Sequence, residues 1–183
     1  MGVPIGIGLA GKTMGVMGLG RLGGYMATYC KALRMNVIAW SQNLTEARCQ
    51  EMGVKLVSKD ELMATSDAIS IHLVLSDRSR GLVGAADIAR MKPGAILINT
   101  SRGPVVDEAA LVWALKERVI AGAALDVYEK EPEIHQGLFA LENALLIPHL
   151  ASATTETRTA MADLAASNAI AVINGQPPIT PVP

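Results

Sequence analysis

The sequence predicts an α/β protein with a Rossmann-type doubly wound parallel sheet, in which helices cover both faces in a three-layer αβα arrangement. Short apolar runs of strand length alternate with helix-like segments along nearly the whole chain, as is typical of successive βαβ units. Of the 183 residues, 50% are hydrophobic but only 3% are aromatic. The core is therefore aliphatic, which favours buried parallel strands over an aromatic-rich β-sandwich.

The strands and helices are expected to alternate along most of the chain, with recognisable helix boundaries. Thr45 and Asp107 are predicted N-caps, because their side-chain oxygens can accept from free N–H groups of a first helical turn. Ser58 and Glu61 fit a capping box. The expected strands are residues 13–17, 36–40, 54–57, 68–73, 95–99, 122–125 and 145–147. The expected helices are residues 22–33, 45–52, 58–64, 85–91, 107–118 and 154–174.

A glycine-rich turn of sequence GLGRLG, at residues 18–23, joins the first strand to the first helix. In this context Gly18 would allow a tight turn, Gly20 would let the backbone approach a pyrophosphate, and Gly23 would let the helix pack closely on the strand. The free N–H groups of the helix N-terminus would hold the pyrophosphate, and Arg21 could add a phosphate contact. The alternative is a glycine-rich turn that binds nothing.

Polar or glycine residues lie at or just after the ends of several strands, the edge where doubly wound sheets bind ligands. These positions are Gly18, Ser41, His72, Thr100, Asp126 and His149. NAD-binding folds usually place a carboxylate after the second strand, but Ser41, Gln42 and Asn43 are neutral. An arginine that would favour NADP is also absent from this stretch. The cofactor is predicted to be NAD or NADP, with NAD favoured.

Charge and composition exclude several function classes. The 16 basic and 17 acidic residues give a net charge of -1, without a basic cluster for nucleic acid. No apolar run reaches the length of a membrane span, and no basic segment resembling that of a signal peptide precedes the apolar N-terminus. The cysteines Cys30 and Cys49 lack metal-ligand spacing and are expected to be reduced. We expect a cytoplasmic protein without a metal, nucleic-acid or membrane partner.

Four further blocks occur downstream of the glycine turn: HLVLS at 72–76, NTSRG at 99–103, ALDVYEKEP at 124–132 and PHLASAT at 148–154. Together with the turn, they resemble in order and content the cofactor-binding domain of the D-isomer-specific 2-hydroxyacid dehydrogenases, over about residues 11–174. We accordingly expect an N-terminal remnant at 1–12, a dinucleotide-binding Rossmann domain at 13–153, and a closing helix with a proline-rich tail at 154–183.

The resemblance implies reversible hydride transfer between a nicotinamide cofactor and a 2-keto or 2-hydroxy acid. It implies a catalytic set in which His149 donates the proton, Glu131 orients and stabilises its charged ring, and Arg102 holds the substrate. The cofactor-binding residues that it implies or the turn predicts are Gly18, Gly20, Arg21, Leu22, Gly23, Ser41, Gln42, His72, Leu73, Ser76, Thr100, Ser101, Arg102, Asp126, His149 and Ser152.

The chain departs from the family pattern at Ser41, usually acidic, and at Val74, commonly proline. Only about a dozen residues precede the first strand, where the family has most of its substrate domain. We therefore expect a truncated chain that binds cofactor with weak or absent turnover unless another chain completes the cleft, and a homodimer. One alternative is a non-catalytic dinucleotide-binding module, such as a redox sensor or interaction domain. A formate dehydrogenase relative is disfavoured, because that group pairs its histidine with glutamine rather than with a residue like Glu131.

Overall fold

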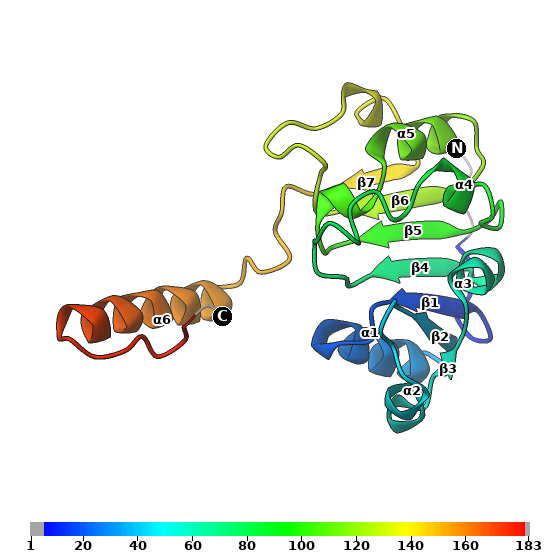
Figure 1. The fold of residues 1–183 in the computed structure, drawn as a ribbon. Helices are drawn as coiled ribbons and strands as arrows, with labels where there is room; N and C mark the ends of the chain where they lie inside the picture. The colour runs from blue at the N-terminus through cyan, green and yellow to red at the C-terminus, as the bar shows by residue number, and fades with distance from the viewer. Residues whose placement is uncertain (1–5, 182–183) are drawn as a thin grey trace. The chain divides into compact units, whose positions relative to one another are not determined.

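A single seven-stranded sheet, in which all neighbouring strands are parallel, forms the centre of the fold (Figure 1). The computed structural model describes residues 6–181. The strand order is β3-β2-β1-β4-β5-β6-β7, so the direction of winding reverses between β1 and β4. This order confirms the predicted doubly wound α/β fold. The strands are β1 (Thr13–Met17), β2 (Asn36–Trp40), β3 (Lys55–Leu56), β4 (Ala68–Ile71), β5 (Ile96–Asn99), β6 (Gly122–Leu125) and β7 (Ala144–Leu146).

Side chains alternate between the two faces of the sheet, because successive residues of a strand point in opposite directions. In β2, Val37 and Ala39 join the core beneath α1 and α2, whereas Ile38 joins the core on the other face. The core on the face of Ile38 also contains Ile88 of α4 and Leu111 of α5. The helices are α1 (Arg21–Ala32), α2 (Glu46–Met52), α3 (Lys59–Thr65), α4 (Ala85–Ile88), α5 (Glu108–Lys116) and α6 (Thr155–Ile173), with short 3₁₀ turns η1 (Gly103–Val105) and η2 (Gln136–Leu138).

Side-chain caps begin several helices where the sequence predicts them. The Thr45, Ser58 and Asp107 side chains accept from the backbone N–H groups of the third helical residues. The predicted capping box at Ser58 is only half formed, because the Glu61 carboxylate binds Lys55 at 2.7 Å. The N-terminal cap contact alone therefore marks the start of α3.

Several predicted elements are longer than the observed ones, among them residues 54–57, where β3 covers Lys55–Leu56, and residues 107–118, where α5 covers Glu108–Lys116. β4 ends at Ile71 rather than at residue 73. The His72 N–H still donates to the carbonyl of Met17, the last residue of β1, at 2.8 Å, and the chain then leaves the sheet. α4 covers only Ala85–Ile88 instead of residues 85–91, and the residues after it form tight turns. The two 3₁₀ turns have too few residues to give a periodic signal in the sequence.

The chain divides into two compact units, Met1–Pro148 and His149–Pro183. The first contains the sheet and α1 to α5. The second contains α6, a helix of 19 residues in which no residue is buried. The division of the sequence at residue 153 into a nucleotide-binding domain and a closing segment stays a prediction.

Cys30 and Cys49 are free thiols in the core beneath α1 and α2. Burial raises the pKa of both. Among residues 6–181, no helix is long and apolar enough to cross a membrane. The same residues contain no group of three or more histidine, cysteine, aspartate or glutamate side chains that could hold a metal ion.

Candidate functional site

The register of the sheet aligns the carboxyl ends of its central strands. Met17 of β1 lies beside Trp40 of β2 and Ile71 of β4, and Ile71 lies beside Asn99 of β5, which lies beside Leu125 of β6. The five residues that follow these strand ends therefore share one edge. They are Gly18, Ser41, His72, Thr100 and Asp126. In a doubly wound sheet, this edge at the reversal of winding is where ligands bind.

The glycine turn between β1 and α1 has backbone geometry that other residues would disturb. Gly18 has φ +97°, and a Cβ there would lie 2.6 Å from the His72 carbonyl oxygen. A Cβ on Gly23 would overlap the Gly18 carbonyl oxygen. By contrast, a Cβ on Gly20 would meet no atom within 4 Å. The turn is therefore tight on the protein side and open in front of Gly20.

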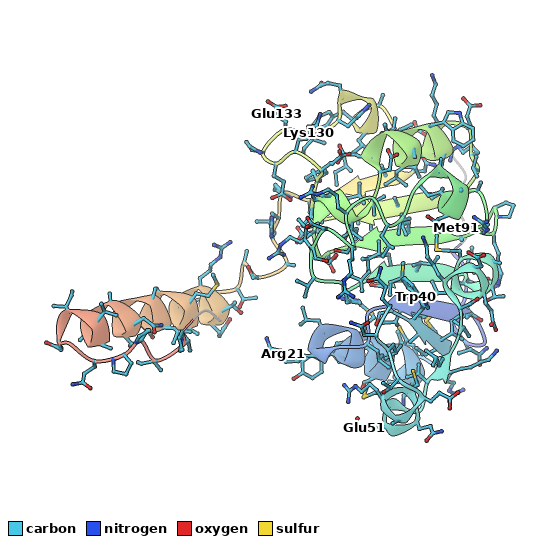
Figure 2. All side chains as sticks on the ribbon, in the orientation of Figure 1. Arg21, Trp40, Glu51, Met91, Lys130 and Glu133 are labelled. Carbon is cyan, nitrogen blue, oxygen red and sulfur yellow. The ribbon has the colours of Figure 1, made fainter. Side chains whose placement is uncertain are left out.

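The N-terminus of α1 follows this open space directly. Gly20 is the N-cap residue and provides no side-chain hydrogen bond, and the first turn contains no acidic residue. Arg21 is exposed at the start of the helix (Figure 2). Unsatisfied N–H groups, the helix dipole and a nearby guanidinium all favour an anion. These residues fit the pyrophosphate of a dinucleotide, with Gly20 leaving room for it.

Backbone hydrogen bonds hold the glycine turn against its neighbours. The Gly18 N–H donates to the Trp40 carbonyl at 2.9 Å. His72, on the other side, is half-buried, and its Nε2 lies 2.9 Å from the Ser70 hydroxyl. Burial lowers the pKa of His72. The glycine turn, the turn at Ser41 and the loop beginning at His72 are therefore joined at one place.

Asn99 organises the loop after β5 that carries Thr100, Ser101 and Arg102. Its Oδ1 accepts from the Ser101 N–H at 3.1 Å and from the Ser101 hydroxyl at 2.9 Å. Its Nδ2 donates to the Arg102 carbonyl at 3.0 Å, and Asn99 itself is only 1% exposed. Sequence reasoning missed this residue. The sequence does place an asparagine at the end of an apolar strand. An amide side chain there can both donate and accept hydrogen bonds, which could have indicated its role in the loop.

The loop after β6 brings Asp126 and Glu131 to the same edge. Asp126 is 1% exposed, and its N–H donates to the Asn99 carbonyl at 3.0 Å. Glu131 is exposed, and its Oε1 accepts from the Tyr128 N–H at 3.0 Å. The Tyr128 hydroxyl donates to the Ile147 carbonyl at 3.0 Å. Burial, with the charge of Asp126 as a further cause, raises the pKa of Tyr128.

The structure thus brings the residues of the β5 and β6 loops together, including Arg102. Arg102 is exposed, and its Nη1 donates to the Ser101 carbonyl at 2.6 Å. His149 and Ser152 belong to the second unit. His149 has a left-handed backbone, with φ 53°, a conformation that non-glycine residues adopt rarely. Its pairing with Glu131 stays a prediction.

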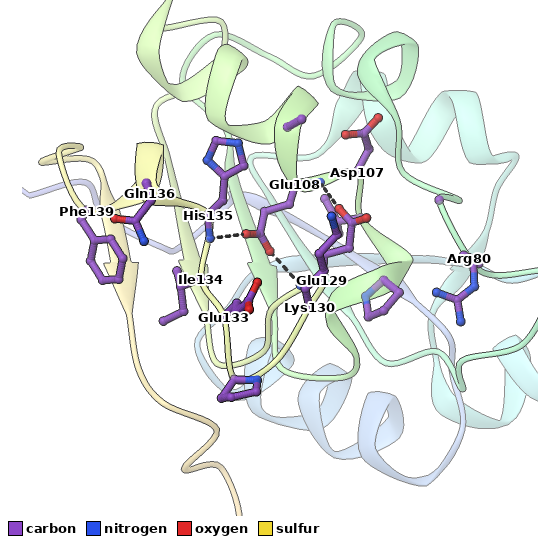
Figure 3. Close-up of a pocket in the computed structure, with 15 residues that line it drawn as sticks. Arg80, Asp107, Glu108, Glu129, Lys130, Glu133, Ile134, His135, Gln136 and Phe139 are labelled. Atoms are coloured by element: carbon purple, nitrogen blue, oxygen red, sulfur yellow. Dashed lines mark hydrogen bonds between the residues drawn. The ribbon is translucent and has the colours of Figure 1, made fainter.

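A cavity of about 1050 Å³ lies beside α5, between the start of that helix and the segment after β6 (Figure 3). Its lining includes Arg80, Glu108 and His135 but none of the glycine turn and none of the three predicted catalytic residues. We place the candidate site at the strand ends, because the glycine turn and the Asn99 loop are there.

Glu108 connects this cavity to the candidate site. The side chain is 7% exposed, and its two oxygens accept from the Glu129 N–H at 2.8 Å and the His135 N–H at 2.9 Å (Figure 3). These contacts hold both ends of the segment that carries Glu131. Sequence reasoning missed Glu108, since a carboxylate directly after the N-cap Asp107 is equally typical of an ordinary first helical turn.

The family model described as "D-isomer specific 2-hydroxyacid dehydrogenase, NAD binding domain" matches residues 3–151. The chain belongs to this family. This result confirms the family resemblance predicted from the sequence motifs. The family's domain binds a nicotinamide cofactor. Glyoxylate reductase of Thermococcus litoralis is 45% identical over 174 residues, which are 95% of this chain and 53% of that protein. D-3-phosphoglycerate dehydrogenase of Archaeoglobus fulgidus is 43% identical, over 94% of this chain and 33% of that protein.

A solved structure shows the same fold. The glyoxylate reductase of Paecilomyes thermophila superposes with a TM-score of 0.87 and 38% sequence identity, over 98% of this chain and 55% of that chain. The chain spans about half the length of the glyoxylate reductases it matches and a third of the phosphoglycerate dehydrogenase. The similarity therefore concerns the cofactor-binding half of these relatives.

Stability should depend on pH through His72. Its pKa in the folded chain is lowered from 6.5, so the unfolded chain binds more protons between the two pKa values. The free energy of unfolding should therefore fall as pH drops below about 6.5 and level off below the folded pKa. His72→Asn should flatten this dependence in urea unfolding between pH 5 and 8. An unchanged pH dependence in His72→Asn contradicts the assignment.

Glu108→Gln should destabilise the first unit. An amide has one acceptor oxygen, so one of the two N–H groups that bind Glu108 loses its partner and faces an NH₂ donor. Leaving a buried polar group unsatisfied costs about 2 kcal/mol, which urea unfolding at pH 7 would measure. Glu117→Gln, the same change at the exposed C-cap residue at the other end of α5, is the control. Equal stability of the two variants would show that the Glu108 contacts contribute little.

Proposed function

We propose that the chain binds NAD or NADP along the carboxyl edge of the sheet and that it serves hydride transfer between this cofactor and a 2-keto or 2-hydroxy acid. The observation that carries the proposal is the turn at residues 18–23, which is closed on the protein side and open in front of Gly20. The pyrophosphate would lie over Gly20 and the N-terminus of α1. The ribose next to the adenine would lie by Ser41 and Gln42.

Three residues of this chain have proposed roles in the reaction, for which the bound cofactor supplies or accepts the hydride. Arg102 presents an exposed guanidinium from a loop that Asn99 holds in place, and would bind the substrate carboxylate or carbonyl. Glu131 is oriented by the Tyr128 N–H and would stabilise a charged imidazole. His149 would give its proton to the oxygen that becomes the hydroxyl.

The remaining proposed contacts follow from the same arrangement. Asp126, buried at the end of β6, would lie near the nicotinamide, and His72, Leu73 and Ser76 would line the adenosine side. Glyoxylate is the first substrate to test, because several of the matched proteins are named glyoxylate reductases. Homodimerisation is proposed on the family resemblance, and a cytoplasmic location on the cysteine usage and hydropathy pattern of the sequence.

Gly20→Ala should separate cofactor binding from folding. A Cβ at this position meets no protein atom, so the free energy of unfolding should change by less than about 0.5 kcal/mol. The methyl group would occupy the space of the pyrophosphate, and affinity for NADH and NADPH in calorimetry should fall at least about tenfold. Gly94→Ala, also in open space, should bind like the wild type. Undiminished binding by Gly20→Ala would refute the proposed pyrophosphate position.

The reaction itself is tested by oxidation of NADH or NADPH with glyoxylate, hydroxypyruvate or pyruvate. A general acid contributes about 10²- to 10⁴-fold to rate, so any turnover should fall to background in His149→Asn, and calorimetry with NADH should show that the variant still binds cofactor. Arg102→Lys should chiefly raise KM. A chain that binds cofactor but reduces 2-keto acids no faster than His149→Asn would be a dinucleotide-binding module without this chemistry.

A further inference from the structure

The turn after β2 lacks the group that recognises an unphosphorylated ribose. Ser41, Gln42 and Asn43 carry no charge, and the Leu44 N–H closes a turn onto the Ser41 carbonyl at 3.2 Å. A carboxylate at this place would accept from the ribose hydroxyls and repel a 2′-phosphate. Its absence removes the barrier to a phosphate but supplies no attraction for one.

The structure brings an arginine to this turn from a distant part of the sequence. The Gln42 Nε2 donates to the backbone carbonyl of Arg78 at 3.2 Å, across 36 positions of the chain. This contact joins the turn after β2 to the loop after β4. The backbone of an arginine that lies far from Ser41 in the sequence is therefore held at this turn.

The backbone at Arg78 is fixed by its own loop as well. The Ser79 N–H donates to the Ser76 carbonyl at 3.0 Å, which forms a tight turn with Arg78 at its third position. The Ser79 hydroxyl accepts from the Ser76 N–H at 2.8 Å and donates to the Val74 carbonyl at 2.7 Å, and Ser79 is 7% exposed. The turn thus presents a side chain from a fixed backbone.

The Arg78 side chain is available for a ligand. It is exposed, and its guanidinium makes no hydrogen bond or ion pair with any residue between 6 and 181. The neighbouring Asp77 is also exposed, and it forms no ion pair with any residue between 6 and 181. Arg48 is a second arginine near the glycine turn, since its Nε donates to the Leu19 carbonyl at 3.3 Å. Its guanidinium already forms an ion pair with Glu51 at 2.7 Å.

We infer that Arg78, held in place by Gln42, recognises the 2′-phosphate of NADP(H) and makes this chain prefer NADP(H) to NAD(H). A guanidinium offers a planar fork of donors that matches two phosphate oxygens, and such charge-assisted bonds are stronger than neutral ones. The Ser41 hydroxyl offers a further donor at the same turn. The inference rests on the proposed cofactor site, since it requires the adenosine ribose to lie by Ser41.

Calorimetry of the 183-residue chain with NADPH, NADH, adenosine 2′,5′-bisphosphate and 5′-AMP tests the inference. We expect NADPH to bind at least about tenfold tighter than NADH. Arg78→Ala should lower affinity for NADPH and for the bisphosphate by about 10- to 100-fold, the range for a lost charged hydrogen bond. Affinity for NADH and 5′-AMP should stay within about twofold of the wild type.

Arg80→Ala is the matched control, because Arg80 is an exposed arginine of the same loop whose side chain lines the cavity beside α5 (Figure 3). Arg80→Ala should leave the ratio of NADPH affinity to NADH affinity unchanged. Gln42→Ala should lower this ratio by less than Arg78→Ala does, because it removes the hydrogen bond to the Arg78 carbonyl but keeps the Arg78 charge. Circular dichroism would verify that all variants fold.

Three outcomes overturn the inference. Equal binding of NADH and NADPH by the wild type, or a preference for NADH, refutes it while the proposed function stands. A loss in Arg78→Ala that is equal for both cofactors shows a structural effect of the loop and also refutes it. Failure of a folded wild-type chain to bind any of the four ligands refutes the proposed function and the inference together.

Discussion

The candidate site depends on the close approach of α1 to the end of β1. Gly23 has no side chain, so the helix can lie against the Gly18 carbonyl, and Gly18 adopts a φ of +97° that turns the chain within a few residues. A side chain at either position would push the helix away from the strand. The helix N-terminus would then no longer face the open edge of the sheet, and the space in front of Gly20 would lose its wall.

The same constraint recurs at the other half of the sheet. A Cβ on Gly103 would overlap the Tyr128 carbonyl, so the loop that follows Arg102 can lie against the loop that leads to Glu131. Two close backbone contacts, one at β1 and one between β5 and β6, therefore set the positions of most candidate residues. Loops usually vary more than the elements they connect, and these contacts restrict that freedom where the chemistry is proposed.

Buried or half-buried polar side chains supply the second level of order. Asn99, Glu108 and Ser79 each bind backbone groups of a loop, and each is less than a tenth exposed. Because a buried polar group without a partner is costly, each of them favours a single arrangement of its loop. Arg102, Glu131 and Arg78 are exposed, and the buried side chains fix the backbone of the loops from which they extend.

The sequence alone determined the fold class, the family and the positions of β1, β2 and β6, because these depend on local apolar runs and on the order of short motifs. It also predicted the glycine turn, since strand, turn and helix are consecutive there. The end of β4 was predicted two residues too late, because the apolar run continues to Leu73 whereas the neighbouring strand β1 ends at Met17, opposite Ile71. Only the tertiary structure decided the contacts of Glu108 with Glu129 and His135 and of Gln42 with Arg78. These join residues more than 20 positions apart, and whether they meet depends on strand order and register, which local patterns do not encode.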